Sequence, residues 1–186
     1  MNIKFNFADA DNSQVPVPVF EQIFAEVSGG AMVSGQAFDV LESTAVGYDT
    51  ENKLQPIKAY KVVNAVGTAD TTIKIKKGSG VAVGDVITYG KNGVSCTDVD
   101  TTNADYDVVT VTMGVAIAEG TVLYQGKTAS TDATEPIYTP IYLLGDRIYA
   151  NEGDAMCRLI NGANIRRESC NVADEVVALM KGIHKI

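Results

Sequence analysis

The sequence is short of the residues that enzymes and metal proteins commonly use. Its 186 residues include no tryptophan, one histidine and three cysteines. An odd number of widely spaced cysteines gives neither a zinc-binding pattern nor a complete disulfide framework. We therefore expect Cys96, Cys157 and Cys170 to be free thiols, as in a protein assembled in a reducing compartment. A disulfide between Cys157 and Cys170 is the alternative.

Motifs for catalysis and phosphate binding are absent as well. The sequence has no Walker, Rossmann or His-Glu-x-x-His pattern. Gly78-Ser79-Gly80 is a glycine-rich turn without the Lys-Ser/Thr pair of a phosphate-binding loop. The single histidine, His184, lies near the end of the sequence, which argues against a Cys–His nucleophile pair. We expect a protein that is not an enzyme and that holds no cofactor and no metal.

Two charged clusters have two interpretations each. Asp98, Asp100, Asp105 and Asp107 form the densest acidic cluster, but their spacing differs from that of an EF-hand. They are either solvated turn residues or an adventitious calcium site. Residues 166–168, Arg-Arg-Glu, are either an interfacial ion-pair element or the exposed end of a strand.

Overall charge and hydropathy exclude further classes. The hydrophobic share of 46% and the charged share of 20% are typical of a folded soluble protein. A net charge of −8 argues against a general nucleic-acid binder, which would carry a basic face. No apolar run reaches membrane-spanning length, and residues 1–14 lack the apolar core of a signal peptide. We expect no nucleic-acid partner, no membrane association and no export by the usual signal route.

What the sequence does contain is a strong β pattern over residues 71–124. Ile73 and Ile75 alternate with polar residues, as in a half-buried strand. Residues 90–93, Gly-Lys-Asn-Gly, predict a hairpin in which Asn-Gly supplies the positive φ angles of a type I′ turn. Val109, Val111 and Met113 are expected to share one buried face. Strands are predicted at residues 73–75, 86–89, 94–99, 107–113 and 121–124, and together they should form one antiparallel unit.

The flanking regions continue this pattern with less regularity. Short strands are expected within residues 32–48, 56–63 and 141–144. Residues 48–53 predict a polar turn, and residues 125–140 predict a long surface loop or a hinge. A final strand pair is expected at residues 155–160 and 163–166, with Asn161-Gly162 as its turn. Frequent turns between short strands favour an antiparallel β-barrel or sandwich-like domain with short N-terminal and C-terminal helices.

The N-terminal region differs from the rest and predicts an attachment segment. Residues 1–7 alternate between apolar and polar, as in an edge strand or an extended arm. After a linker that ends at Pro18, a predicted short helix docks either on its own β core or on another subunit or a capsid. We expect two regions, an arm and helix in residues 1–30 and a β-rich domain in residues 31–186. The helix presents an apolar stripe, the candidate contact site: Phe20, Ile23, Phe24 and Val27.

A second short helix is expected near the end of the chain. Asn171 is the predicted N-cap, with Asp174 three residues later as a variant of the capping box. Gly182 stands at the expected C′ position. One apolar face should pack on the β core, with Val176 and Leu179 buried. The residues of this face are Val172, Val176, Leu179 and Ile183.

Several of these segments carry a resemblance to a known family. Residues 71–124 place in order a strand, Lys-Lys-Gly, Val-Gly-Asp-Val, Asn-Ala-Asp-Tyr-Asp, a valine-threonine strand and Ala-Glu-Gly-Thr-Val-Leu-Tyr. Residues 164–169, Asn-Ile-Arg-Arg-Glu-Ser, then lead into a short helix, and residues 47–56 read Gly-Tyr-Asp, a turn, and Lys-Leu-Gln-Pro. This order resembles the head fibre or capsid-decoration proteins of tailed bacteriophages.

The resemblance implies a virion structural protein on the outer surface of a phage head. Its partners would be the major capsid protein and further copies of itself, with a trimer as the first expectation. It would be present in the host cytoplasm during assembly and on the capsid afterwards. The alternative is a glycan-binding or host-surface-binding module, such as a fibre tip or adhesin. Tyr48, Tyr89 and Tyr106, near polar turns, could then contact a sugar.

Overall fold

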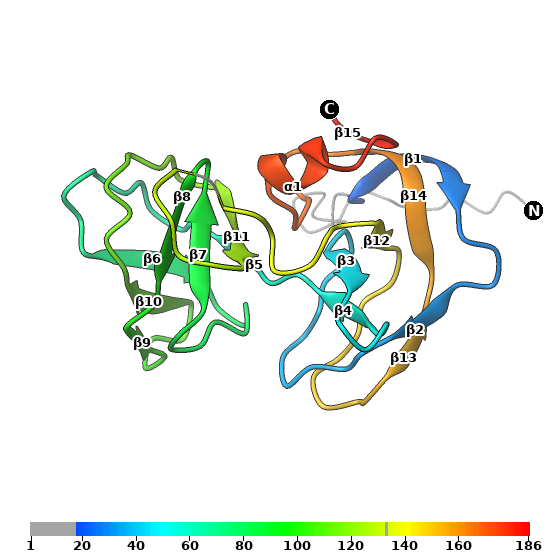
Figure 1. Cartoon of the computed structure of the whole chain (residues 1–186), viewed down its shortest axis with the longest axis horizontal. Coiled ribbons are helices and arrows are strands. Elements are labelled where there is room, and N and C mark those ends of the chain that lie inside the picture. The colour runs from blue at the N-terminus through cyan, green and yellow to red at the C-terminus, as the bar shows by residue number, and fades with distance from the viewer. Residues whose placement is uncertain (1–17, 133) are drawn as a thin grey trace, which may run out of the picture.

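A computed structural model describes residues 18–132 and 134–186 of the chain. Within these residues the protein is mainly β, with fifteen strands and one short helix. The strands form two lobes that lie side by side (Figure 1). We call residues 18–57 and 137–186 the proximal lobe and residues 58–136 the distal lobe. The prediction of a mainly β protein is confirmed.

The proximal lobe is built on one curled sheet of eight strands. Their order is β1-β14-β12-β3-β4-β2-β13, with β15 beside β14. All pairings are antiparallel except β2 with β4 and β14 with β15. The strands are β1 (Phe20–Glu26), β2 (Ala31–Val33), β3 (Ala45–Tyr48), β4 (Leu54–Pro56), β12 (Tyr142–Leu144), β13 (Ala155–Cys157), β14 (Leu159–Ile165) and β15 (Ile183–Lys185).

The curl of this sheet follows from which strands are consecutive in the chain. β1 runs on into β2, and β13 runs on into β14. These two segments pair antiparallel with each other along their length, and a bond from Val27 N to Leu159 O of 2.8 Å joins the two halves. β2 also meets β4, where Val33 is opposite Leu54. The pairings therefore form a ring, which gives the lobe its barrel-like shape. Two clusters of buried apolar side chains fill it.

The distal lobe packs two antiparallel sheets around one core. One sheet has the order β6-β10-β9 and the other β5-β11-β7-β8. A bridge between Val62 and Ile75 connects them on one side, and the chain crosses from β8 into β9 on the other. The strands are β5 (Ala59–Lys61), β6 (Thr72–Lys76), β7 (Val86–Tyr89), β8 (Asn92–Ser95), β9 (Asp98–Asp100), β10 (Tyr106–Thr110) and β11 (Val122–Gly126).

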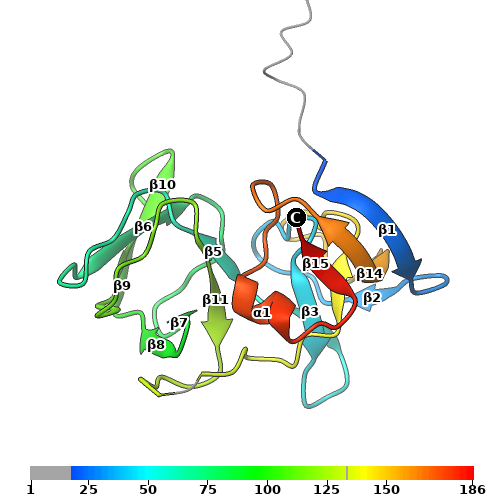
Figure 2. The same cartoon turned by 90° about the horizontal axis from the view of Figure 1, so that it is seen from above.

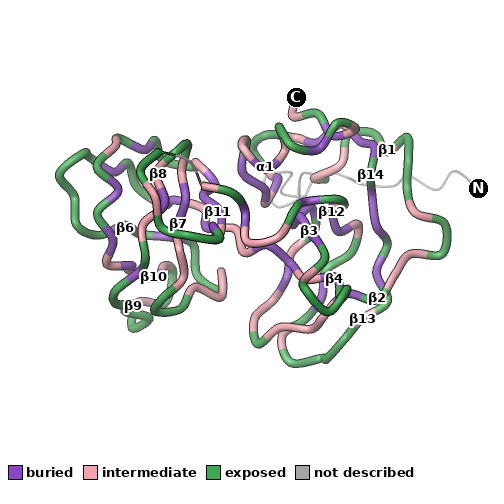
Figure 3. Tube along the Cα trace, viewed as in Figure 1, coloured by how far each residue is buried: buried purple, intermediate pink, exposed green. Residues whose placement is uncertain are grey.

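The burial predicted for the distal lobe is confirmed. Ile73 and Ile75 are buried while Lys74 between them is exposed, and Val109, Val111 and Met113 all lie in the core. In Figure 3 the exposed stretches follow mainly the connecting loops, and the buried stretches follow the strands. The strands of residues 71–124 share this core, but they belong to two sheets and need β5 from outside the stretch.

The turn and the return strand predicted after Tyr89 need correction. Tyr89 pairs with Asn92, so the two turn residues are Gly90 and Lys91. Gly90 has φ +59°, as the first central residue of a type II′ turn requires, and Asn92 begins β8. The single strand predicted at residues 94–99 is two strands, because the chain leaves one sheet at Ser95 and joins the other at Asp98.

The N-terminal helix prediction is wrong, because residues 20–26 form strand β1. Phe20 and Ile23 face the same way although they are three positions apart, which would put them on opposite faces of a regular strand. β1 has irregular register between Phe20 and Gln22 and again between Ile23 and Ala25. Each bulge inserts an extra residue into the strand, so side chains three positions apart can point to the same face. The spacing of the apolar residues is therefore the same as in a helix. The alternating residues 1–7 lie outside the described residues.

Asn161-Gly162 is not the hairpin turn that its dipeptide predicts. Both residues lie inside β14, and β13 pairs instead with β2. A Cβ on Gly162 would come within 2.8 Å of Ala25 Cβ and of the Phe24 ring. The glycine is therefore needed because bulged β1 crosses closely over β14, not because the chain turns.

The C-terminal helix is present but shorter than predicted. α1 (Asp174–Ala178) has Ala173 as its N-cap, without a side-chain cap. Asn171 instead donates from Nδ2 to Thr44 Oγ1 at 3.1 Å. Val172, Val176 and Ile183 are buried as expected, but the Leu179 prediction is wrong, since this residue is 57% exposed at the helix end. Gly182 lies beyond the helix, in the turn that precedes β15.

The polar turn predicted at residues 48–53 is confirmed, and it joins β3 to β4. Tyr48 pairs with Leu54, and the polar turn lies between them. The Asp49 carboxylate accepts the backbone N–H groups of Glu51 and Lys53, at 2.8 and 2.9 Å. The bond from the Lys53 backbone is the main reason that the pKa of Asp49 lies below its usual range. A single side chain thus holds the whole turn.

The two lobes are joined by two chain crossings and a small number of contacts (Figure 2). Lys61 Nζ donates to Glu168 O, and Gly90 N donates to Glu175 Oε1, both at 2.8 Å. The Phe38 ring packs so closely on Gly80 that a Cβ there would lie 2.2 Å from it. Tyr124 of β11 is buried in the same cluster as the proximal core. Polar contacts and two aromatic side chains therefore set how the lobes meet.

Candidate functional site

The four predicted contact residues do not form one exposed stripe. Phe20 and Ile23 pack against the proximal core, and Val27 packs against a second cluster in the same lobe. Only Phe24 is largely accessible, with 55% of its surface exposed. β1 therefore belongs to the fold, and it offers a partner one aromatic side chain on its outer surface.

The rest of β1 is fixed to β14 by charge as well as by backbone pairing. Glu21 forms an ion pair with Arg166, and Glu26 forms one with Arg158 at 3.3 Å. β1 stands at the end of the sheet order, so its second edge has no strand partner among the described residues. The bulges of β1 make a regular pairing along this edge harder. Side chains on its outer face are thus better placed for contacts than its backbone.

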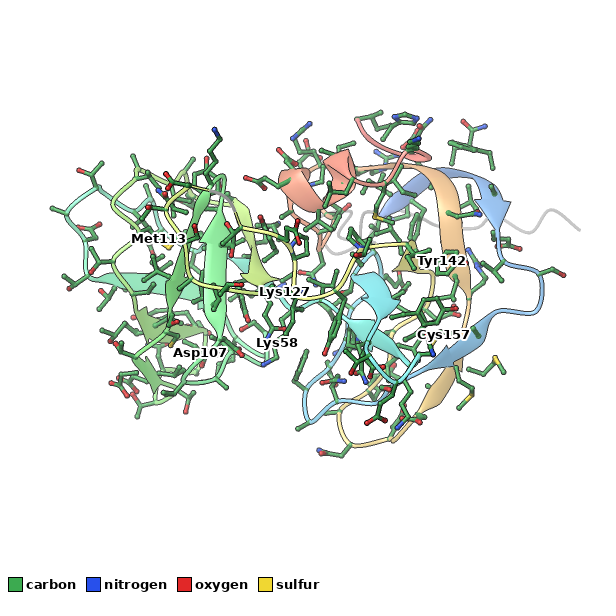
Figure 4. All side chains as sticks on the ribbon, viewed as in Figure 1. Lys58, Asp107, Met113, Lys127, Tyr142 and Cys157 are labelled. Atoms are coloured by element: carbon green, nitrogen blue, oxygen red, sulfur yellow. The ribbon has the colours of Figure 1, made fainter. Side chains whose placement is uncertain are left out.

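A second apolar feature lies where β2 pairs with β13. Met32 and Met156 are directly opposite each other in the register, and they are 50% and 65% exposed. Their neighbours Val33 and Cys157 point to the other face and are buried. Figure 4 shows Cys157 inside the proximal lobe at this ribbon. Methionine adapts its shape readily and is common at binding surfaces, so the pair is a candidate contact point.

The acidic cluster of the distal lobe does not form a metal site. Asp107 is buried and pairs with Lys77 at 2.8 Å, whereas Asp98, Asp100 and Asp105 are exposed. Among the described residues no group of three or more His, Cys, Asp or Glu side chains could hold a metal ion. The solvated-turn interpretation fits only Asp105, because Asp98 and Asp100 are exposed residues of strand β9. Asp107 is one half of a structural ion pair.

The other charged and thiol candidates also have structural roles. Arg166 binds Glu21 on β1, and Arg167 binds Asp174 on α1 at 2.8 Å, so this motif ties the chain ends to β14. The three cysteines are free and buried, which excludes the pairing of Cys157 with Cys170 in this structure. Burial is the main reason that the pKa of the Cys96 and Cys157 thiols is raised, which lowers their reactivity at neutral pH.

The best-built polar cluster surrounds Asp85, next to both crossings between the lobes (Figure 4 labels Lys58). Asp85 Oδ2 accepts from Lys58 Nζ at 2.9 Å, from Tyr60 Oη at 3.0 Å and from Ala82 N at 2.9 Å. Gln125 Nε2 donates to Oδ1 at 3.0 Å. Burial, and then the charge of Asp85, raises the pKa of the Tyr60 phenol far above its usual range.

This arrangement holds a structure together and does not perform chemistry. Every donor is directed at the same carboxylate. Lys58 stands at the first crossing between the lobes, and Gln125 of β11 accepts through its backbone oxygen the N–H of Ile137 at the second. A carboxylate that accepts four hydrogen bonds is fixed in position, which suits an anchor better than a proton-transfer group. Sequence reasoning missed this cluster because its members are far apart in the chain.

A hollow of about 560 Å³ lies between the lobes, beside α1. Its walls carry Lys61, Arg167 and Lys185 facing Asp174 and Glu175. These groups already bind one another or backbone atoms, as Lys61 does with Glu168 O and Lys185 with Asp174. A ligand would have to displace these bonds, so the hollow is not a preformed site for a small molecule.

The three tyrosines that could serve a sugar are not brought together. Tyr48 ends β3 in the proximal lobe, while Tyr89 and Tyr106 lie on β7 and β10 of the distal lobe. Tyr106 already stacks under the Lys74 ammonium, 4.7 Å from the ring centre.

No helix of the described residues is long and apolar enough to cross a membrane.

Comparisons with known proteins identify no relative of this chain. No protein-family model matches the chain, and neither a curated protein nor a solved structure resembles it significantly. The functional argument therefore depends on the sequence and on the surfaces described above.

Proposed function

We propose that this chain is a non-enzymatic virion structural protein that binds the outer surface of a phage capsid as a head fibre or decoration protein. The resemblance of residues 71–124 and 164–169 to that family supports the proposal. A capsid protein as partner, a homo-oligomeric state and a place on the virion all belong to it.

The proposal rests on the positions of the accessible apolar side chains of the proximal lobe. Phe24, Met32 and Met156 are exposed on the outer face of the ribbon formed by β1, β2, β13 and β14. The polar groups of the hollow between the lobes, in contrast, largely satisfy one another. A surface with apolar contact points and no open reactive cluster supports binding rather than turnover.

The structure changes how attachment should be tested. Deleting residues 1–27 would remove a whole strand of the proximal sheet, so a loss of binding could result from unfolding. Point substitutions on the outer face avoid this problem. We expect Phe24→Ser together with Met156→Ser to abolish co-sedimentation with purified phage heads at unchanged melting temperature.

Val83→Ser is the matched control. Val83 is 64% exposed and lies in the distal lobe, so its loss should leave binding intact. If the Phe24→Ser, Met156→Ser variant still decorates heads at full occupancy, these side chains do not carry attachment. If the wild-type protein binds no heads but binds a glycan array, the recognition-module alternative replaces the proposal.

A further inference from the structure

A second hollow lies on the proximal lobe, where β2 pairs with both β4 and β13 (Figure 1). Its volume is about 280 Å³. Three segments that are far apart in the chain meet around it: the end of β2, the β3–β4 turn and the residue before β13. We call it the β3–β4 hollow. Ligand pockets commonly measure about 300–1,000 Å³, so this one suits a single small ring rather than a long ligand.

The polar side chains of the β3–β4 hollow are still free to bind, unlike those of the hollow between the lobes. Ser34, Tyr48 and Asn52 line it, and their side chains bond to no other group in the described part of the chain. Asp154 Oδ1 accepts the N–H of Gly35 at 3.2 Å, whereas Oδ2 accepts no hydrogen bond from the described residues. Two hydroxyl groups, an amide and one carboxylate oxygen are therefore available side by side.

The charges around this hollow disfavour an anionic ligand. Within the described lining, Lys53 is the only cation, and it already pairs with Glu51 at 2.9 Å. The bond to Glu51 is the main reason that the pKa of Lys53 is raised, and the charge of Asp154 adds to it. Two carboxylates thus act on one ammonium group, so a phosphate, sulfate or carboxylate would meet net negative charge.

The apolar part of the lining is a ring and a flexible side chain. Tyr48 is 47% exposed and Met32 is 50% exposed. An aromatic ring offers a flat apolar face, and the C–H groups on one side of a pyranose can pack against it. The hydroxyl groups at the edge of the same sugar need donors and acceptors nearby, which hydroxyl, amide and carboxylate side chains provide.

The backbone around the hollow is fixed before any ligand binds. Gly35 lies so close to Gly153 that a Cβ on Gly35 would come within 2.1 Å of the Gly153 carbonyl oxygen. On the other side, Asp49 holds the turn that carries Asn52. Binding therefore requires little ordering of loops, and this favours even a small ligand.

We propose that the β3–β4 hollow binds one uncharged pyranose unit of a glycan. The Tyr48 ring packs against the C–H face of the sugar, and Ser34, Asn52 and Asp154 bond to its hydroxyl groups. This binding goes beyond capsid attachment and does not depend on it, because Phe24 and Met156 do not line the hollow.

NMR titration of the ¹⁵N-labelled full-length protein tests the site. The probes are the methyl pyranosides of glucose, galactose, mannose, N-acetylglucosamine and N-acetylgalactosamine. Methyl glucuronide is the anionic comparison, since Asp154 should repel its carboxylate. We expect at least one neutral glycoside, at millimolar concentration, to shift the amide signals of residues 34, 48 and 52–54. Methyl glucuronide should bind more weakly than that glycoside.

Substitutions then assign the binding to named side chains. In Asn52→Gly, glycine keeps the φ of +60° without strain and only the amide is lost, so binding should weaken about two- to tenfold. Tyr48→Ala should weaken binding about tenfold or more, whereas Tyr48→Phe keeps the ring and should stay close to the wild type. Tyr149→Ala is the matched control, because Tyr149 is a 54% exposed tyrosine of the same lobe outside the hollow. Melting temperatures show whether each variant is folded.

Three results would overturn the proposal. The first is that no neutral glycoside shifts these signals, and the second is that methyl glucuronide binds more tightly than all of them. The third is binding that survives Asn52→Gly and Tyr48→Ala, which would place the sugar elsewhere. Both variants retain Phe24 and Met156 and should co-sediment with phage heads like the wild type, so failure of the sugar site and failure of capsid attachment are separate results.

Discussion

Asp85 offers the sharpest test of how the fold is held together. Its carboxylate accepts hydrogen bonds from Lys58, Tyr60, Ala82 and Gln125, and its side chain is only 11% exposed. Lys58 leads into β5, and Gln125 of β11 accepts through its backbone oxygen the N–H of Ile137, where the chain returns to the proximal lobe. Replacing Asp85 should therefore loosen the distal lobe and both crossings together.

The size of the effect follows from the geometry. Asp85→Ala leaves the 16%-exposed Lys58 ammonium without its partner, and removing one member of a buried ion pair costs about 3–5 kcal/mol. We expect about 3 kcal/mol, because Lys58 can turn partly toward water. In Asp85→Asn the remaining oxygen can still accept hydrogen bonds. The new N–H₂ group can donate to Gln125 once the Gln125 amide rotates to present its oxygen. Its cost should be about 1–2 kcal/mol, the part due to charge.

Urea unfolding measures both variants. The transition midpoint should fall for Asp85→Ala and about half as far for Asp85→Asn, at an unchanged slope. For a chain of this size the larger loss corresponds to a melting temperature lower by about 10 °C. Asp105→Ala is the control, since Asp105 is exposed and its side chain makes no described contact, and it should change stability by less than about 0.5 kcal/mol.

Two results would refute this reasoning. If Asp85→Ala unfolds at the wild-type urea concentration, the four bonds contribute nothing net and the lobes are held by other contacts. If Asp85→Asn costs as much as Asp85→Ala, the charge alone matters and the shared hydrogen bonds do not.

Three further predictions concern pH, the C-terminal helix and the contact between the lobes. Because the folded protein keeps the Tyr60 phenol protonated, unfolding releases its proton at high pH, so stability should fall above about pH 10; Tyr60→Phe should show a smaller fall in urea titrations across that range. Val176→Asp should cost about 3 kcal/mol or more, while exposed Leu179→Asp should stay within about 0.5 kcal/mol; equal melting temperatures would contradict the observed helix face. Gly78 and Gly80 both have positive φ, but only a Cβ at Gly80 would meet a side chain of the other lobe, so Gly80→Ala should lower the melting temperature clearly more than Gly78→Ala.

Part of the protein could be predicted from the sequence alone. The alternation around Ile73 and Ile75 determined which side chains are buried in β6, because a strand's side chains alternate strictly between two faces. The polar turn at residues 48–53 determined the β3–β4 hairpin, because Asp49 bonds only to near neighbours in the chain. The wide spacing of the three cysteines also predicted free thiols. Each of these features depends on local chemistry or on composition.

Only the tertiary structure decided the rest. Phe20, Ile23, Phe24 and Val27 have helical spacing, yet bulged pairing with β14 makes residues 20–26 a strand. Asn161-Gly162 reads as a turn, yet the close approach of β1 requires that glycine inside β14.

The candidate surfaces are decided in the same way. Met32 and Met156 are 124 residues apart in the chain and face each other only because β2 pairs with β13. The donors around Asp85 also come from distant segments. The periodicity of the sequence shows which face of a helix or strand is apolar. The pairing of distant strands decides which residues that face contacts. This pairing depends on the closure of both lobes rather than on any short stretch of residues.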